Sequence, residues 1–116
     1  MKQSPIFSRT YDLLRWLIPM TVKFPRQQRF VLAARIQVTA LDFQEQLIEA
    51  AQSDDPLPRL READVTLIKL RTYLRLCQDL ELLNPGQYAH AARMVSEVGR
   101  LLGGWLKKET DSQAKP

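Results

Sequence analysis

The 116-residue sequence contains only one cysteine and one histidine, and this scarcity excludes several classes of protein. Cys77 has no second cysteine with which to form an intramolecular disulfide, which fits a reducing compartment. No cluster of Cys and His has the spacing of metal ligands, and the Glu-x-x-His pairs of a di-iron bundle are absent. His90 lies between two alanines and Cys77 within an apolar pattern, so neither indicates a catalytic nucleophile. We therefore expect a protein that is not an enzyme and that holds no metal and no cofactor.

Long hydrophobic runs are also missing from the sequence. No apolar segment approaches the roughly 20 residues that a membrane-spanning helix needs. The first residues lack the pattern of a signal peptide, in which a charged segment precedes an apolar one. Glycine occurs only four times, and no glycine-rich phosphate loop follows a strand. These absences support the expectation of a cytoplasmic protein with no membrane contact.

The residues that are present describe an ordinary folded domain. The chain is 45% hydrophobic and 26% charged, which is typical of a helical globular protein and not of a disordered one. Lys and Arg number 17 against 13 Asp and Glu, giving a net charge of +4, and most of the cations are arginine. This excess is compatible with a polyanionic partner such as RNA or DNA, although many basic domains bind no nucleic acid.

Prolines divide the chain into four segments with helical periodicity. Pro25 follows the first segment, a turn at 53–58 follows the second, and Asn84 and Gln87 can form a capping box before the fourth. No stretch shows sustained alternation of β-branched residues, so no strand is predicted. We predict helices at 5–23, 26–52, 57–83 and 85–108, followed by a frayed polar tail at 109–116. Pro19 is expected to kink the first helix or to end it early.

The last two predicted helices have apolar residues at alternating spacings of three and four, which is the pattern of a coiled-coil-like seam. The seam residues are Leu60, Ala63, Leu67, Leu70, Leu74 and Cys77 in one helix, and Tyr88, Ala91, Val95, Val98, Leu102 and Trp105 in the other. Short connections make consecutive helices antiparallel neighbours. The sequence therefore predicts an all-α protein, an up-down-up-down four-helix bundle over residues 1–108.

Two helices carry more apolar or small residues than one seam requires. The segment 26–52 has one stripe of Leu32, Ile36, Phe43 and Leu47 and a second of Phe30, Ala34, Leu41 and Ile48. The segment 85–108 has a row of small residues, Ala89, Ala92, Ser96, Gly99 and Gly103, that allows another helix to approach closely. Glycine costs about 1 kcal/mol relative to alanine inside a helix, so close packing should offset it. We predict self-association, with Ala92, Ser96, Gly99 and Gly103 in the oligomer interface.

Arginine is the side chain suited to bidentate recognition of phosphate and carboxylate groups. Arg71 and Arg75 are four residues apart and therefore share one face of the third predicted helix. The further candidates are Lys23, Arg26 and Arg29, where the first helix meets the second, and Arg100 on the last helix. Each of these cations is either a contact for a nucleic-acid or protein partner or a surface residue that is solvated or paired with a neighbouring acid.

Several short segments stand in a recognisable order along the chain. They are Ile18-Pro19 with Phe24-Pro25-Arg26, Ala63-Asp64 with Leu70-Arg71-x-x-Leu74-Arg75, Pro85-x-Gln87, and Glu97-Val98-Gly99-Arg100-x-Leu102-Gly103-x-Trp105. Together they resemble the accessory variability determinant (Avd) proteins of diversity-generating retroelements, over nearly the whole chain. The resemblance implies a barrel-shaped homopentamer of four-helix bundles. It also implies a non-enzymatic accessory protein that binds the retroelement's reverse transcriptase and nucleic acid during mutagenic cDNA synthesis, with Arg71 and Arg75 at the family's candidate contact positions.

Two alternatives remain open on the sequence. Bundle proteins encoded in intervening sequences of large ribosomal RNA genes are similar in pattern. A pure assembly scaffold without nucleic-acid contact fits the second apolar faces equally well. A neighbouring reverse-transcriptase gene with a template/variable repeat pair would distinguish the first function from the other two. Salt-dependent binding to RNA or DNA would distinguish a nucleic-acid binder from a scaffold.

Overall fold

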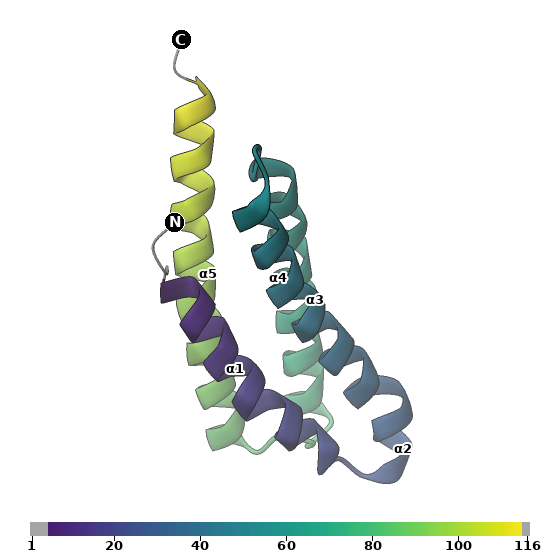
Figure 1. The fold of residues 1–116 in the computed structure, drawn as a ribbon. Helices are drawn as coiled ribbons and strands as arrows, with labels where there is room; N and C mark the ends of the chain where they lie inside the picture. The colour runs from purple at the N-terminus through teal and green to yellow at the C-terminus, as the bar shows by residue number, and fades with distance from the viewer. Residues whose placement is uncertain (1–4, 115–116) are drawn as a thin grey trace.

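A computed structural model of the chain describes residues 5–114, which form the helices drawn in Figure 1. The elements are α1 (Pro5–Val22), α2 (Arg26–Gln28), the π-helix η1 (Arg29–Ala33), α3 (Ala34–Gln52), α4 (Leu57–Asp79) and α5 (Pro85–Ala114). α2, η1 and α3 follow one another without a break and form one long helical segment. Residues 5–114 therefore consist of four long helical segments, and they contain no strand.

The four segments form a bundle in which each helix packs against two others. α3 packs against α4, α4 packs against α5, and α1 closes the ring by packing against both α3 and α5. Consecutive segments run in opposite directions (Figure 1), and the molecule extends over 54 × 23 × 22 Å. The predicted four-helix bundle is confirmed for the described residues.

The core consists of the apolar positions that the helical periodicity selected. All members of the predicted seam in α4, from Leu60 to Cys77, are buried. In α5 the inner seam residues are buried, and the two end residues, Tyr88 and Trp105, are half-buried and pack against the core. The Trp105 ring meets the Phe7 ring edge to face, with 6.0 Å between centroids, so it joins the start of α1 to α5. Trp105 therefore lies at the rim of the core rather than inside it.

The two predicted stripes of the second segment have different environments. The stripe of Leu32, Ile36, Phe43 and Leu47 is buried in the core. The stripe of Phe30, Ala34, Leu41 and Ile48 is exposed, and Phe30 has 74% of its surface accessible. One helix can turn only one face toward a single core, so the second stripe stays uncovered in the isolated chain.

Pro19 does not end α1, which continues to Val22. Proline cannot donate the backbone hydrogen bond that would reach the carbonyl of Arg15. Both Pro19 and Arg15 are exposed, so water can reach this carbonyl, and the helix continues past the missing bond. Of the two expected effects of Pro19, a kink or an early end, the early end does not occur, and α1 closes within one residue of the predicted boundary.

The third helix ends earlier than predicted, at Asp79 instead of residue 83. The chain reverses through Glu81, whose φ of 62° lies in the left-handed region. The amide of Glu81 donates to the carbonyl of Gln78 and the amide of Leu82 to that of Cys77, which is the hydrogen-bond pattern of a Schellman motif. Glycine usually occupies a left-handed position of this kind. Because this chain has Glu81 there, no glycine in the sequence marks the end of the helix.

The last helix begins as predicted and ends later. The amide of Asn84 donates to Gln87 Oε1 at 2.9 Å, and the amide of Gln87 donates to Asn84 Oδ1 at 2.8 Å, which confirms the capping box. α5 then continues to Ala114, so residues 109–114 are helical where a frayed tail was expected. Gln113 Nε2 donates a hydrogen bond to Asp55 Oδ1 and links this end of α5 to the turn between α3 and α4. The two final residues of the expected tail lie outside the described part.

Candidate nucleic-acid and partner interface

The Arg71 side chain reaches from α4 to the backbone of α5 at Gly99. A Cβ placed on Gly99 would lie 3.5 Å from Arg71 Cζ and would overlap Arg71 Nη2. The guanidinium group therefore occupies the space that any other residue at position 99 would fill with its side chain. This contact brings together a residue predicted to bind a partner and a residue predicted to lie in an oligomer interface.

Small residues of α5 form one wall of a groove beside this contact. The groove has a volume of about 170 Å³ and is lined by Arg71, Leu74, Tyr88, Ala92, Val95 and Ser96. Ala92 and Ser96 thus face α4 of the same chain at this groove, as Gly99 does. Gly103 continues the row, but among residues 5–114 no atom outside the adjacent part of α5 lies within 4 Å of the position that its Cβ would take. The row of small residues consequently has two parts, one beside Arg71 and one open to solvent.

Arg71, Arg75 and Arg100, the candidate contacts on α4 and α5, lack acidic partners within the described chain. Ion pairs among residues 5–114 join Arg9 to Glu97 and Arg59 to Glu62. Glu97 is the acidic residue nearest to Arg100 in the sequence, and Arg9 of α1 already holds it. Arg71, Arg75 and Arg100 are exposed and form no ion pair with a described carboxylate. Their charge is therefore available to an anion outside the chain.

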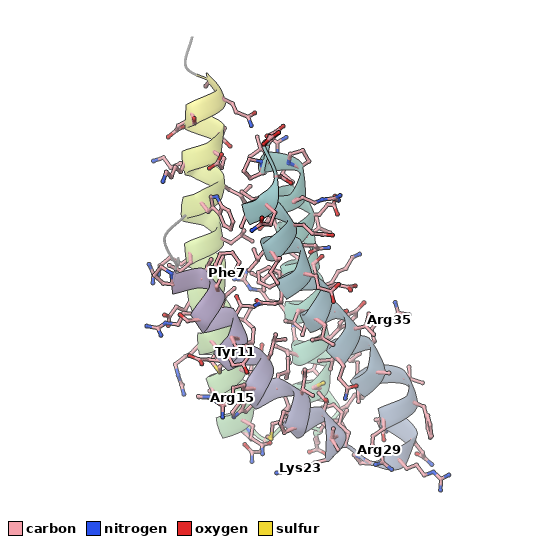
Figure 2. All side chains as sticks on the ribbon, in the orientation of Figure 1. Phe7, Tyr11, Arg15, Lys23, Arg29 and Arg35 are labelled. Atoms are coloured by element: carbon pink, nitrogen blue, oxygen red, sulfur yellow. The ribbon has the colours of Figure 1, made fainter. Side chains whose placement is uncertain are left out.

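A second group of cations lies where α1 turns into η1. Lys23, Arg26 and Arg29 are exposed there, and Figure 2 shows Lys23 and Arg29 at the end of the bundle. No acidic residue stands between Asp12 and Asp42 in the sequence, so the charged residues of this turn are all basic. The six predicted cations therefore do not form one patch: three surround the α1–η1 turn, and the others lie on α4 and α5.

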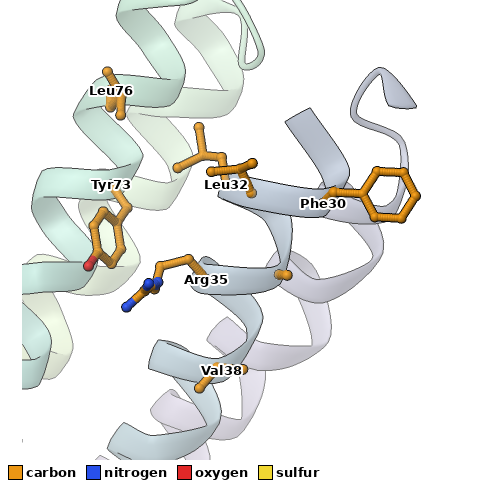
Figure 3. Close-up of a pocket in the computed structure, with 8 residues that line it drawn as sticks. Phe30, Leu32, Arg35, Val38, Tyr73 and Leu76 are labelled. Carbon is orange, nitrogen blue, oxygen red and sulfur yellow. The ribbon is translucent and has the colours of Figure 1, made fainter. Parts of the chain in front are cut away.

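An apolar groove adjoins this basic end. It has a volume of about 750 Å³ and is lined by Phe30, Val31, Leu32, Ala34, Arg35, Val38, Tyr73 and Leu76. Figure 3 shows Tyr73 and Leu76 on α4 facing the segment that carries Leu32 and Arg35. The π-helix η1 forms part of the groove, and π-helical turns occur frequently at functional sites. Sequence reasoning identified the exposed stripe that begins at Phe30 but not the contributions of Arg35, Tyr73 and Leu76, because they depend on how α3 packs on α4.

His90 packs against an aromatic side chain, and Cys77 lies in the core. His90 packs against Trp16 of α1, with 5.0 Å between ring centroids. Cys77 is buried, and burial raises the pKa of its thiol from 9.0 to about 11, so the reactive thiolate is scarce at neutral pH. In the part of the chain that the structure describes, no three His, Cys, Asp or Glu residues are grouped so that they could hold a metal ion. None of its helices is long and apolar enough to cross a membrane.

A family model described as bAvd-like matches residues 5–109 of the chain. The chain belongs to the bAvd-like family. The match covers all four helical segments of this bAvd-like bundle, and it confirms the family resemblance drawn from the sequence motifs. No curated protein matches the chain significantly.

Proposed function

We propose that this bAvd-like protein is a non-enzymatic accessory subunit of a diversity-generating retroelement, acting in the cytoplasm. In this role it binds the element's reverse transcriptase and nucleic acid and so supports mutagenic cDNA synthesis. The observation that carries the proposal is the family match over residues 5–109. The polymerase active site belongs to the partner, and the bundle contributes binding surfaces.

The unpaired arginines support binding to an anionic partner. Arg71 and Arg75 are exposed on α4, they have no acidic partner among the described residues, and they stand at the family's candidate contact positions. Arginine contributes a planar set of donors that matches phosphate or carboxylate oxygens. Lys23, Arg26, Arg29 and Arg100 are the further contacts in this proposal.

Uncovered apolar surface supports the proposed homo-oligomer, which we take to be a pentamer. Most of the large apolar side chains that remain exposed lie on η1, α3 and α4, namely Phe30, Val31, Val38, Leu41, Ile48, Val65, Ile68 and Leu76. Phe30, Val31, Val38 and Leu76 line one groove, and an exposed apolar patch marks an interaction site in many soluble proteins. A ring of identical subunits needs two different patches per chain, because each subunit contacts two neighbours through non-equivalent faces. The open part of the small-residue row at Gly103 is a candidate for the second patch.

Co-purification with the reverse transcriptase encoded beside the gene tests this function most directly. We expect a stable complex in which the accessory protein is present in several copies, measured by light scattering. If the protein is a monomer at micromolar concentration, the proposed assembly is wrong. If it assembles but binds neither the reverse transcriptase nor an oligonucleotide at low salt, it is an assembly scaffold, a function that the same apolar surface would serve.

A further inference from the structure

Gly99 and Gly103 lie one turn apart in α5 and share a helical face, but their surroundings differ. Glycine is unfavourable inside a helix relative to alanine, so each position raises the question of why alanine does not occupy it. At Gly103 no described atom outside the adjacent part of α5 lies within 4 Å of a hypothetical Cβ. At Gly99 the Arg71 guanidinium occupies the space of that Cβ. Close approach of a side chain therefore requires glycine at position 99 and not at position 103.

We propose that Gly99 is a positioning residue, which holds the Arg71 guanidinium against α5 so that it binds a phosphate of single-stranded nucleic acid at the α4–α5 groove. This inference rests on the proposed function and adds to it the residue that sets the geometry of the contact. Glycine leaves room for the guanidinium beside the α5 backbone, and a Cβ at position 99 would exclude this placement. Glycine at position 99 therefore contributes to affinity although it touches no ligand.

The surroundings of Arg71 favour a phosphate chain over a single carboxylate. Arg75 follows one helical turn later on α4, and Arg100 follows Gly99 directly on α5. All three arginines are exposed and without acidic partners among residues 5–114. Repeated cations along two adjacent helices match the regularly spaced charges of a nucleic-acid backbone. Tyr88 and Ser96 line the groove beside Arg71, and their hydroxyl groups are of a type that donates to phosphate oxygens.

The substitution Gly99→Ala separates positioning from stability. The atom that a new Cβ would overlap is the far end of a long flexible side chain, so Arg71 can rotate away without any movement of the backbone. The next nearest atom, Leu67 Cδ2, would lie at 3.5 Å, an ordinary van der Waals distance. Gly99→Ala should thus preserve or raise the melting temperature, because alanine favours the helix, while it displaces the guanidinium.

The experiment measures binding of a fluorescein-labelled 20-nucleotide oligo(dT) by anisotropy, at several salt concentrations, with the full-length chain. The variants are Gly99→Ala, Arg71→Ala, the double variant, and Gly104→Ala as the matched control on the same helix, because a Cβ at Gly104 meets no neighbouring side chain within 4 Å among the described residues. Arg71→Ala should weaken binding roughly tenfold, because a charge-assisted contact is lost. It should also reduce the log–log salt slope by about 0.7, the value for one phosphate contact to a single strand. Gly99→Ala should approach both effects, and the double variant should lose no more than Arg71→Ala does.

A control variant and three alternative outcomes separate the positioning role of Gly99 from the proposed nucleic-acid contact. Gly104→Ala should keep the affinity and salt slope of the wild type, with a melting temperature at least as high. If Gly99→Ala binds like the wild type while Arg71→Ala does not, the positioning role is wrong and the proposed nucleic-acid contact stands. If the wild type binds no oligonucleotide at low salt, the nucleic-acid part of the proposed function fails as well. If both variants bind oligo(dT) normally but lose the reverse transcriptase, the ligand of Arg71 is a protein carboxylate and the phosphate assignment is overturned.

Discussion

The two sides of α4 present different chemistry to solvent. Toward α5, α4 borders a narrow groove with small residues and an unpaired Arg71. Toward η1 and α3, it borders a wider groove lined mainly by apolar side chains. Both grooves arise from the same helix, whose seam supplies the core between them. The proposed function uses this difference: in the proposal, the α5 side binds an anionic partner and the η1–α3 side binds another copy of the chain.

Val38→Asp should have the largest effect and should act on the apolar side alone. Val38 lines the wider groove and is 56% exposed, so the substitution leaves the bundle core intact. If this groove is the subunit interface, burying a carboxylate in it should weaken the association of two neighbouring subunits by about 3–5 kcal/mol. Light scattering should then show smaller species, while circular dichroism retains the helical signal. An unchanged assembly size would place the subunit interface elsewhere.

The double substitution Arg71→Ala and Arg75→Ala should have the opposite selectivity. Loss of two charge-assisted contacts should weaken binding of the reverse transcriptase or nucleic acid by about 2–3 kcal/mol. Because neither arginine is in an ion pair within the described chain, the free energy of unfolding should change by less than about 0.5 kcal/mol. Binding assays and urea unfolding would measure the two quantities. Dissociation into monomers would instead assign both arginines to the subunit interface and remove the distinction between the two sides.

Trp105→Ala should destabilise the bundle to an intermediate degree. A fully buried tryptophan would cost about 3–5 kcal/mol, but Trp105 is half-buried and contacts Phe7 at the rim of the core. We therefore expect a loss of about 2 kcal/mol in urea unfolding. A loss as large as that of a core residue would mean that the assembled protein covers Trp105 further.

Glu81→Gly should have the smallest effect and should be stabilising. Glu81 has a φ of 62°, a conformation that is unfavourable for a residue with a Cβ. Glycine adopts it freely, although it also increases the freedom of the unfolded chain. The free energy of unfolding should rise by up to about 1 kcal/mol. This gain is measured as a higher midpoint of urea unfolding, with an unchanged dependence of the free energy on urea concentration. Since Glu81 lies on neither groove, assembly and binding should both stay as in the wild type.

Periodicity was sufficient to predict the bundle, because burial in a four-helix bundle depends mainly on which face of each helix is apolar. The seam from Leu60 to Cys77 follows directly from spacing. In the second segment spacing gave two apolar stripes, and only the structure shows that the one from Leu32 to Leu47 is buried. The helix ends were harder to predict. Glu81 adopts a conformation that glycine usually marks, and Gln113 reaches Asp55 across a separation that no local pattern reveals.

For the candidate site, the sequence indicated individual residues but not which of them lie next to one another. The sequence selected Arg71 and Gly99 for different roles, and their contact depends on the register between α4 and α5. Arg35 and Tyr73 were not selected, because the groove that they share exists only once α3 packs on α4. Side-chain type and helical face can be read from one segment, whereas a contact between two helices requires their relative placement.

The environment of Cys77 makes the chain convenient for spectroscopy. The thiol is buried, and its pKa of about 11 keeps it protonated at neutral pH, so maleimide reagents should react with it very slowly. A second cysteine introduced at a solvent-open position such as Gly104→Cys would react selectively, with the native residue left in place. In the proposed homo-oligomer, fluorophores or spin labels attached there would report the distances between subunits, and hence the symmetry, in solution.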